Sequence, residues 1–272
     1  MPRAIEAPCP RESPVADPSP SRGPQPDELL VATLNLRNIA DRWSERIPLL
    51  LADMAALQPD LIGLQECVFA VQQDRLLGAA AAGRYESRRG WAGRPEYGNA
   101  VLGKTPLALG EGQRLELDHN RSALRVPVSL PSGATLDFVV THLHHLVADE
   151  AVREAQARAL ASWLADIEGA LVVVGDFNAE PTEPTYRVML DARFRSAHAE
   201  ANGAEPAATW PSGIKAPGMD EDGEPGCLDY IWVRGPITVE GCRLAFDRPA
   251  VDDPTLYPSD HLGLSARLNI DG

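Results

Sequence analysis

The chain of 272 residues is 44% hydrophobic, which is enough apolar material for one large or two small domains with a sizeable core. Its formal net charge of −14 argues against a general nucleic-acid coat protein, because contact with many phosphates requires a basic face. It contains no apolar run that would span a membrane, no recognisable secretory signal and no cysteine pair with metal-ligand spacing, so we expect a cytoplasmic protein with reduced thiols.

The first 26 residues differ in composition from the rest of the chain. They contain eight of the 24 prolines, and their acidic and basic side chains balance. Such a segment cannot bury enough apolar surface to offset the entropy lost on ordering. We therefore predict a disordered, proline-rich tail over residues 1–26 and a folded domain over residues 27–272, which carries essentially the whole negative charge.

The folded part begins with an apolar segment, residues 29–36, that predicts a buried strand. Asn35 interrupts its apolar character near the carboxyl end, and a single asparagine there is most simply a turn residue. Apolar residues at helical spacing follow over residues 47–57. Pro48 is expected in the first turn of this helix, where proline is tolerated.

A second buried strand is predicted over residues 61–66, and it ends on Glu66, which by itself is most simply an exposed acid. Residues 84–97 then combine arginine with tyrosine and tryptophan. This segment either contacts a polyanion or a nucleobase, or forms a solvated hairpin, and the hairpin is favoured. Asn99 leads from it into the apolar strand 100–102.

Two further strands are expected in the middle of the chain. Residues 120–128 resemble an edge strand that begins at a polar corner. Residues 136–142 form a strand that ends in the cluster His142, His144 and His145. This spacing lacks the helical separation of zinc-binding histidine pairs and no cysteine is near, so zinc is disfavoured.

The clearest helix covers residues 149–167, which carry one apolar face. It leads into residues 171–174, four apolar residues in a row that predict a buried strand. The chain turns after this strand, and two oxygen-bearing side chains follow, Asp176 and Asn178. Alone they indicate either an Asx turn or a site for a hard cation and the phosphate that it polarises.

The last third of the chain contains a glycine- and proline-rich loop with four acids, residues 211–226. A strand over residues 227–233 follows, with Asp229 near its start. Asp260 and His261 then precede a final strand.

Five strands thus carry polar side chains at their ends, which suggests that these ends meet at a common rim. Carboxylates, amides and imidazoles together suit metal-assisted phosphoryl hydrolysis, with oxygen ligands for Mg²⁺ or Mn²⁺ and imidazoles for proton transfer. The residues concerned are Asn35, Glu66, His142, Asp176 with Asn178, and Asp260 with His261.

The ordered set of short motifs resembles the endonuclease/exonuclease/phosphatase superfamily, the DNase I-like proteins, from about residue 29 to the C-terminus. The resemblance implies a four-layer α/β sandwich, in which two packed, mixed and mostly antiparallel sheets are flanked by helices. The motifs are Thr-Leu-Asn-Leu at 33–36, Leu-Gln-Glu at 64–66, Gly-Asn-Ala-Val-Leu at 98–102, Thr-His-Leu at 141–143, Gly-Asp-Phe-Asn-Ala at 175–179, Leu-Asp-Tyr-Ile at 228–231 and Ser-Asp-His at 259–261.

The same resemblance implies a metal site that binds Mg²⁺ or Mn²⁺. Glu66 resembles the principal metal ligand of the family and Asn35 its polar neighbour in the metal site. Asp260 resembles a further metal ligand. One departure concerns exonuclease III type AP endonucleases, which carry a second acid shortly after this asparagine, where the present chain has Leu36 and Arg37.

The catalytic residues follow from the same motifs. Asp176 and Asn178 resemble the pair that positions the attacking water and the scissile phosphate. His261 resembles the histidine that contacts the phosphate or activates water, and Asp229 the acid that orients it. His142 resembles the histidine of DNase I and the sphingomyelinases, and we expect it to protonate the leaving oxygen.

Two residues are expected to bind substrate. Arg121 resembles a phosphate-contacting arginine of DNase I, and Asn99 lies in the Gly-Asn-Ala-Val-Leu motif. AP endonucleases of the exonuclease III type carry a tyrosine in place of His142, which makes AP-site repair a less favoured activity.

The sequence therefore predicts a divalent-metal-dependent phosphoric ester hydrolase. A phosphodiesterase on a small or lipid-like substrate is the first choice, and a DNase I-like nuclease for DNA or RNA is the alternative. A non-catalytic binding module on the same fold is the third reading. The negative charge makes nucleic acid a possible but unfavoured partner, and no obligate protein partner is evident.

Overall fold

The central strands are apolar on both faces, which places them inside the molecule. In β9 (Ala170–Asp176), Val172 and Val174 point into one hydrophobic cluster, whereas Leu171 and Val173 point into another. This alternation accounts for the uninterrupted apolar run, because each face of the strand packs against a different layer.

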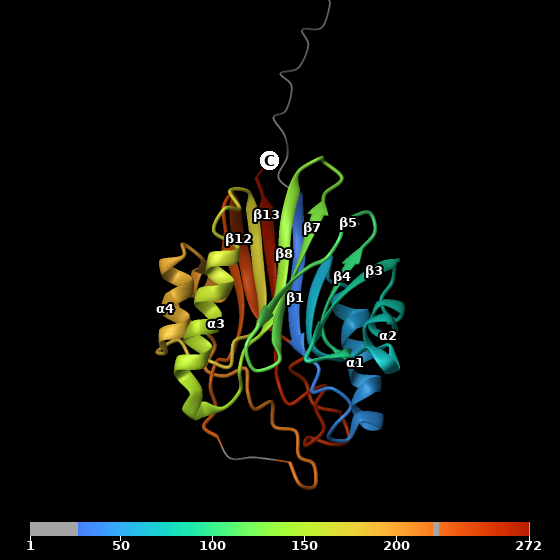
Figure 1. The fold of residues 1–272 in the computed structure, drawn as a ribbon. Helices are drawn as coiled ribbons and strands as arrows, with labels where there is room; N and C mark the ends of the chain where they lie inside the picture. Colours follow the sequence, from blue (N-terminus) through green and yellow to red (C-terminus); the bar gives the residue numbers. More distant parts are fainter. Residues whose placement is uncertain (1–26, 220–222, 272) are drawn as a thin grey trace, which may run out of the picture.

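The computed structural model describes residues 27–219 and 223–271. It consists of two β-sheets packed face to face, with helices against the outer face of each sheet (Figure 1). This arrangement confirms the four-layer α/β sandwich expected from the sequence. The tail predicted over residues 1–26 and three of the acids of the 211–226 loop lie outside the described residues.

The first sheet has six strands in the order β12, β13, β1, β2, β4, β3. Only β1 and β2 run parallel, and the other neighbours are antiparallel. The strands are β1 (Asp27–Asn35), β2 (Leu61–Val68), β3 (Tyr85–Ala92), β4 (Arg94–Lys104), β12 (Ile237–Ala245) and β13 (Gly263–Ile270).

The second sheet has the order β10, β11, β9, β8, β7, β5, and β6 also pairs with β7. Here β8 and β9 are the parallel pair, and the remaining pairs are antiparallel. The strands other than β9 are β5 (Ala108–Leu109), β6 (Gln113–Leu117), β7 (Arg121–Ser129), β8 (Thr135–His142), β10 (Arg195–Ser196) and β11 (Asp229–Arg234).

Helices α1 and α2 cover the first sheet, and α3 and α4 cover the second (Figure 1). None of the helices in the described part of the chain is long and apolar enough to cross a membrane. The helical segments are α1 (Trp43–Leu57), η1 (Phe69–Val71), α2 (Gln73–Ala80), η2 (Val147–Asp149), α3 (Glu150–Trp163), α4 (Pro184–Asp191) and α5 (Ala197–Asn202).

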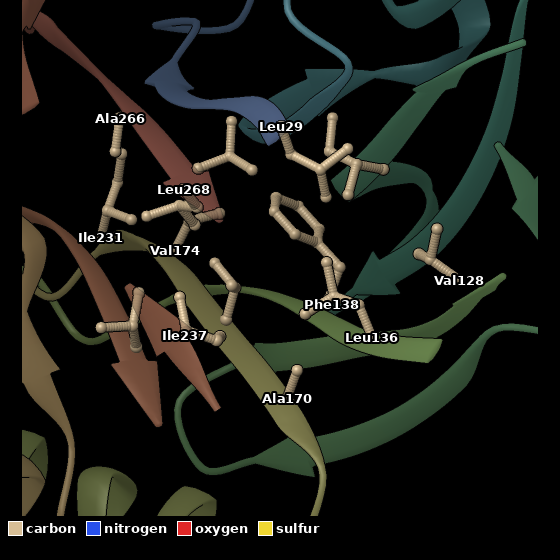
Figure 2. Packing of buried hydrophobic residues seen from close by; sticks show 14 of the residues in the cluster. Leu29, Val128, Leu136, Phe138, Ala170, Val174, Ile231, Ile237, Ala266 and Leu268 are labelled. Atoms are coloured by element: carbon tan, nitrogen blue, oxygen red, sulfur yellow. The ribbon is translucent and has the colours of Figure 1, made fainter. Parts of the chain in front are cut away.

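The largest hydrophobic cluster fills the space between the sheets. Phe138 of β8 lies near Leu29 of β1, and Val174 of β9 lies near Leu268 of β13, as Figure 2 shows. Because these side chains come from both sheets, the cluster fixes how one sheet sits on the other. The strand ends that carry polar residues are thereby held at fixed positions.

Three details differ from the sequence-based expectations. The strand predicted over residues 120–128 is not an edge strand, because β5 and β6 pair with the side of β7 that β8 leaves open. Pro127 is tolerated where β5 gives way to β6, and its carbonyl accepts a bond from Gly110 N. Helix α1 begins at Trp43, so Pro48 lies in its second turn, and α3 ends four residues earlier than expected, at Trp163.

The basic and aromatic segment at residues 84–97 forms the hairpin of β3 and β4. Its arginines are largely engaged within the protein. Arg89 forms a bidentate pair with the buried Asp74, at 2.7 and 2.8 Å. Arg88 donates to the carbonyls of Leu109 and Gly110. Arg88 and Arg89 therefore attach the hairpin to its surroundings.

Gly175 in β9 occupies a position that only glycine fits. Its φ is +143°, and a Cβ atom there would lie 2.0 Å from the carbonyl oxygen of Thr141 on β8. We expect Gly175→Ala to lower the free energy of unfolding by about 1–3 kcal/mol or more, measured by urea denaturation.

Gly169, just before the same strand, provides the matched control. An added Cβ there meets no atom within 4 Å, so Gly169→Ala is expected to change stability by less than about 0.5 kcal/mol. Equal stabilities for the two variants would contradict this interpretation of Gly175.

Candidate active site

The polar strand ends meet at the lower end of the sandwich in Figure 1, where the loops after β1, β8 and β9 gather. Parallel pairing places Asn35 beside Gln65 and His142 beside Asp176, so the ends of these strands lie at the same level. Antiparallel pairing of β11 with β9 places Asp229 opposite Asp176. The common rim expected from the sequence is thus present.

A hydrogen bond between β1 and β9 joins the two sheets at this rim. Asn35 Nδ2 at the end of β1 donates to Asp176 Oδ2 at the end of β9, at 2.9 Å. The same nitrogen lies 3.4 Å from Glu66 Oε1, while Asn35 Oδ1 accepts a bond from the backbone N–H of Arg37. Asn35 therefore presents its amide nitrogen, a donor, to both acids.

Glu66 reaches the rim through an irregularity in β2. The register shifts between Leu64 and Cys67, and Glu66 takes a left-handed conformation with φ 54°. Its carboxylate accepts a 2.7 Å bond from Asn38 Nδ2. The bulge turns this acid out of the strand and toward the neighbouring loop, and such local strain is typical of functional sites.

Asp176 and Asn178 form an Asx turn directly after β9. The backbone N–H of Asn178 donates to Asp176 Oδ1 at 2.9 Å, and Asn178 itself is left-handed with φ 49°. The side-chain amide of Asn178 donates to the carbonyl of Leu143 at 3.1 Å. The two interpretations of this motif from the sequence, an Asx turn and a cation site, are thus compatible, because the turn also places Asp176 at the rim.

His261 forms a buried pair with Asp229. Its Nδ1 lies 2.8 Å from Asp229 Oδ2, and its Nε2 lies 3.7 Å from Asp176 Oδ2. Burial would lower the pKa of His261, but the carboxylates of Asp229, Asp176 and Asp260 outweigh it and raise the pKa well above its ordinary value. The Nε2 side of the His261 ring faces Asp176.

Asp176 is 1% exposed, and its charge is costly in that position. Burial raises its pKa well above the ordinary value for aspartate, and the neighbouring Asp229 carboxylate adds to this effect. The hydrogen bond from Asn35 and the positive charge of His261 act in the opposite direction. The result is a carboxylate with more basic character than an exposed aspartate.

His142 differs from His261 in the direction in which its pKa is shifted. Burial lowers its pKa well below the ordinary value, and the adjacent Arg121 guanidinium, whose Nη1 lies 3.1 Å from the ring nitrogens, lowers it further. His142 Nε2 lies 3.4 Å from Asp176 Oδ2. The expected role of His142 as the acid for the leaving oxygen stays a prediction.

Arg121 lies at the start of β7, and Asn99 lies on the adjacent strand β4 of the other sheet. Besides His142, Arg121 contacts His145, with Nη2 2.9 Å from Nδ1. Asn99 is buried and donates to the carbonyl of Ser122 at 2.7 Å, so it links β4 to β7 beside Arg121. Their roles in substrate binding remain predictions.

The loop before β13 completes the rim. Ser259 Oγ donates to the carbonyl of Asn35 at 2.6 Å and lies 3.2 Å from Asp260 Oδ1. Asp260 Oδ2 lies 3.5 Å from Arg37 Nη1. This loop thereby brings Asp260 and His261 against the end of β1.

Several supporting residues were not identified from the sequence. Asn38 holds Glu66, and its only sequence signal is a polar position three residues after Asn35. Thr209 Oγ1 accepts bonds from the backbone N–H groups of Leu228 and Asp229, at 2.9 and 3.1 Å. Nothing in the sequence marks Thr209, because it lies twenty residues before the strand that it supports.

The oxygen-rich rim fits a hard divalent cation. Among the described residues, Asp176, Asp229 and His261 offer ligand atoms that all lie within 4.8 Å of one another. Asp229 Oδ1 is buried without a hydrogen-bond partner in the described part of the chain. Glu66 and Asp260 add two more carboxylates, and such oxygen ligands are those that Mg²⁺ and Mn²⁺ prefer.

His144 and His145 take other positions. His144 is buried, with Nε2 2.8 Å from Asp149 Oδ2, and His145 is exposed against Arg121. The three histidines that are close in the sequence thus have different surroundings. His142 and His145 lie at the rim beside Arg121, whereas His144 supports the loop that follows β8.

Comparison with known proteins gives a consistent result. The Endonuclease/Exonuclease/phosphatase family matches residues 32–261. Nocturnin from Homo sapiens is 29% identical over 254 residues, which cover 82% of this chain and 57% of that protein. The chain therefore spans just over half the length of this relative.

Solved structures show the same fold. The human Nocturnin catalytic domain with bound sulfate anion has a TM-score of 0.72 and 26% identity, covering 90% of this chain and 95% of that one. D. rerio TDP2 complexed with single strand DNA product has a TM-score of 0.72 at 17% identity, covering 89% and 99%. At that identity, the likeness to TDP2 shows the fold alone.

The close contact between Asp229 and His261 predicts that the two act as a unit. Asp229→Asn and His261→Ala should each lower turnover by on the order of a hundredfold or more, and the double variant should cost little beyond either single change. Steady-state kinetics of the four proteins provide the measurement, with melting temperatures as the control for folding. Strictly multiplicative losses would show that the two residues act independently.

Proposed function

Since this chain belongs to the Endonuclease/Exonuclease/phosphatase family, we propose that it is a divalent-metal-dependent phosphoric ester hydrolase, with a small phosphodiester as its favoured substrate. The observation that carries the proposal is the convergence of two hydrogen-bonded pairs, Asn35 with Asp176 and Asp229 with His261, whose members Asp176 and His261 lie 3.7 Å apart. A buried cluster of this kind is costly to fold, and metal-assisted hydrolysis accounts for it.

Glu66 and Asp260 are the proposed carboxylate ligands of a Mg²⁺ or Mn²⁺ ion, which when bound neutralises charge on the phosphoryl oxygens. Asn35 lies beside them and holds Glu66 and Asp176 through its amide nitrogen. Asn35 remains a proposed member of this metal site, and its amide orders the two acids beside the ion.

The proton roles follow from the charges of the side chains. Asp176, whose pKa is raised by burial, is the proposed base toward an attacking water that Asn178 helps to position. His261, whose pKa the carboxylates of Asp229, Asp176 and Asp260 raise, is the proposed donor to a phosphoryl or leaving oxygen. Neutral His142 and the adjacent Arg121 are proposed to contact the phosphate.

The preference for a small substrate rests on charge. The net charge is −14, and Arg88 and Arg89 of the β3–β4 hairpin, which would otherwise add to a track for a polyanion, are engaged with backbone carbonyls and with Asp74. A long nucleic acid would meet repulsion beyond the scissile phosphate.

A nuclease is the second candidate function. It is favoured by the shared fold with TDP2, which was solved with a single strand DNA product, and by Nocturnin, whose catalytic domain was solved with a bound sulfate anion, a tetrahedral anion like phosphate. A non-catalytic binding module is disfavoured by the completeness of the polar set, because each member adds to the cost of burial.

Substrate class is tested with bis(p-nitrophenyl) phosphate and duplex DNA at equal phosphate concentration, both with Mg²⁺. We expect turnover of the small diester to change by less than about twofold between low and moderate salt, since a single phosphate contact releases few counterions. Cleavage of duplex DNA is expected to be feeble. The initial rates at several salt concentrations provide the measurement.

His261→Ala serves as the control, because loss of both activities in this variant shows that they arise from the proposed site. Efficient cleavage of duplex DNA that weakens steeply with salt would establish the nuclease instead. Absence of turnover on every phosphate ester would favour the binding module.

A further inference from the structure

Arg46, in the first turns of α1, is a buried cation with an unusual set of partners. Its side chain is 0% exposed, and no carboxylate pairs directly with its guanidinium among the described residues. Burial lowers the pKa of Arg46 to about 10, so it remains charged at neutral pH. A charge in this position requires compensation from nearby dipoles.

Backbone carbonyls supply that compensation. A guanidinium has five N–H donors, and each of them has a carbonyl acceptor here. Arg46 donates from Nε to Asp41 O at 2.7 Å, from Nη1 to Leu36 O at 3.0 Å and Pro258 O at 2.9 Å, and from Nη2 to Ala40 O at 2.7 Å and Arg37 O at 3.1 Å.

The loop over residues 36–41 is curled around this guanidinium. Arg37, Asn38 and Asp41 have positive φ values of 53°, 39° and 46°, which residues other than glycine rarely adopt. These conformations turn successive carbonyls toward one centre. Because such a backbone is unfavourable by itself, the arginine at its centre accounts for its persistence.

The curled loop carries the contacts that arrange the acids of the site. Asn38 Nδ2 holds Glu66 Oε2 at 2.7 Å, and Arg37 Nη1 lies 3.5 Å from Asp260 Oδ2. Pro258, whose carbonyl is bound by Arg46, immediately precedes the Ser259-Asp260-His261 motif. Arg46 thereby connects the loop after β1 to the loop before β13, although it touches none of the proposed reacting groups itself.

We propose that Arg46 is a positioning residue of the active site, which sets the placement of Glu66 and Asp260 through a cradle of backbone carbonyls. The proposal rests on the proposed function for its consequence, and on the contacts of Arg46 for its geometry. A lysine retains the charge but cannot reach carbonyls that surround a planar fork, so Arg46→Lys separates charge from geometry.

Arg234 provides a matched control. Its guanidinium also donates to backbone carbonyls, those of Leu164, Ile167 and Ala192, but it lies at the end of β11 opposite to Asp229. Arg234→Lys therefore removes a similar set of bonds without affecting the rim. It is expected to lower the melting temperature while leaving turnover and metal requirement unchanged.

The experiment compares the wild type, Arg46→Lys and Arg234→Lys. For Arg46→Lys we expect kcat on the small diester to fall roughly ten- to a hundredfold, with a smaller change in KM and a severalfold higher Mg²⁺ concentration for half-maximal activity. Hydrogen exchange should accelerate at residues 36–41 and 258–261. Wild-type kinetics and exchange in a folded Arg46→Lys protein would overturn the proposal.

Two further measurements separate the possible failures. Asn38→Ala removes the contact between the loop and Glu66, so it should also raise the Mg²⁺ requirement. If Arg46→Lys fails to fold while Asn38→Ala keeps the wild-type requirement, the role of Arg46 is stability alone and the proposal is wrong.

A wild-type chain without metal-stimulated hydrolysis would overturn the proposed function instead. Calorimetric titration with Mn²⁺ and hydrogen exchange would still test the geometry, with weaker Mn²⁺ binding and faster exchange in Arg46→Lys supporting the role of Arg46. Unchanged Mn²⁺ binding and exchange would contradict it.

Discussion

A carboxylate buried between two sheets imposes the main constraint on this structure. Asp176 is removed from water and lies within 4 Å of Asn35, His142 and His261, which come from three other segments of the chain. A charge in such a place is tolerated only when donors and opposite charges surround it. The positions of the neighbouring strands and loops can be understood as meeting this requirement.

The fold surrounds Asp176 with donors through two parallel strand pairs in otherwise antiparallel sheets. Pairing of β1 with β2 and of β8 with β9 brings the carboxyl ends of four strands to one level. The hydrophobic cluster between the sheets then fixes the distance across which Asn35 reaches Asp176. The loops add what the strands cannot, since Asp260 and His261 come from the segment that enters β13.

Much of this arrangement was predictable from the sequence. Apolar runs located the strands, and polar residues at the ends of five of them indicated a shared rim, although Asn35 and Glu66 taken singly are most simply a turn residue and an exposed acid. Asn35, Glu66 and Asp176 could thus be identified as neighbours. The family resemblance added the antiparallel partners and the sandwich, which periodicity alone does not give.

Other features depend on contacts between distant segments. The pairing of β7 on both sides requires the short strands β5 and β6, which carry too few residues to show a pattern. The pairing of Arg89 with the buried Asp74 joins two elements of the fold, and the residue types alone do not predict it. Nothing in the sequence indicates the role of Arg46, because its partners are backbone carbonyls whose direction is set by the loop conformation.

The claim that the rim forms a metal-dependent hydrolytic site is tested most directly by exhaustive chelation followed by metal replacement. The account predicts that the chelated protein has no hydrolytic activity on a small phosphodiester, that Mg²⁺ or Mn²⁺ restores it, and that Zn²⁺ is not needed, because the offered ligands are mainly oxygens. Full activity after exhaustive chelation would contradict it.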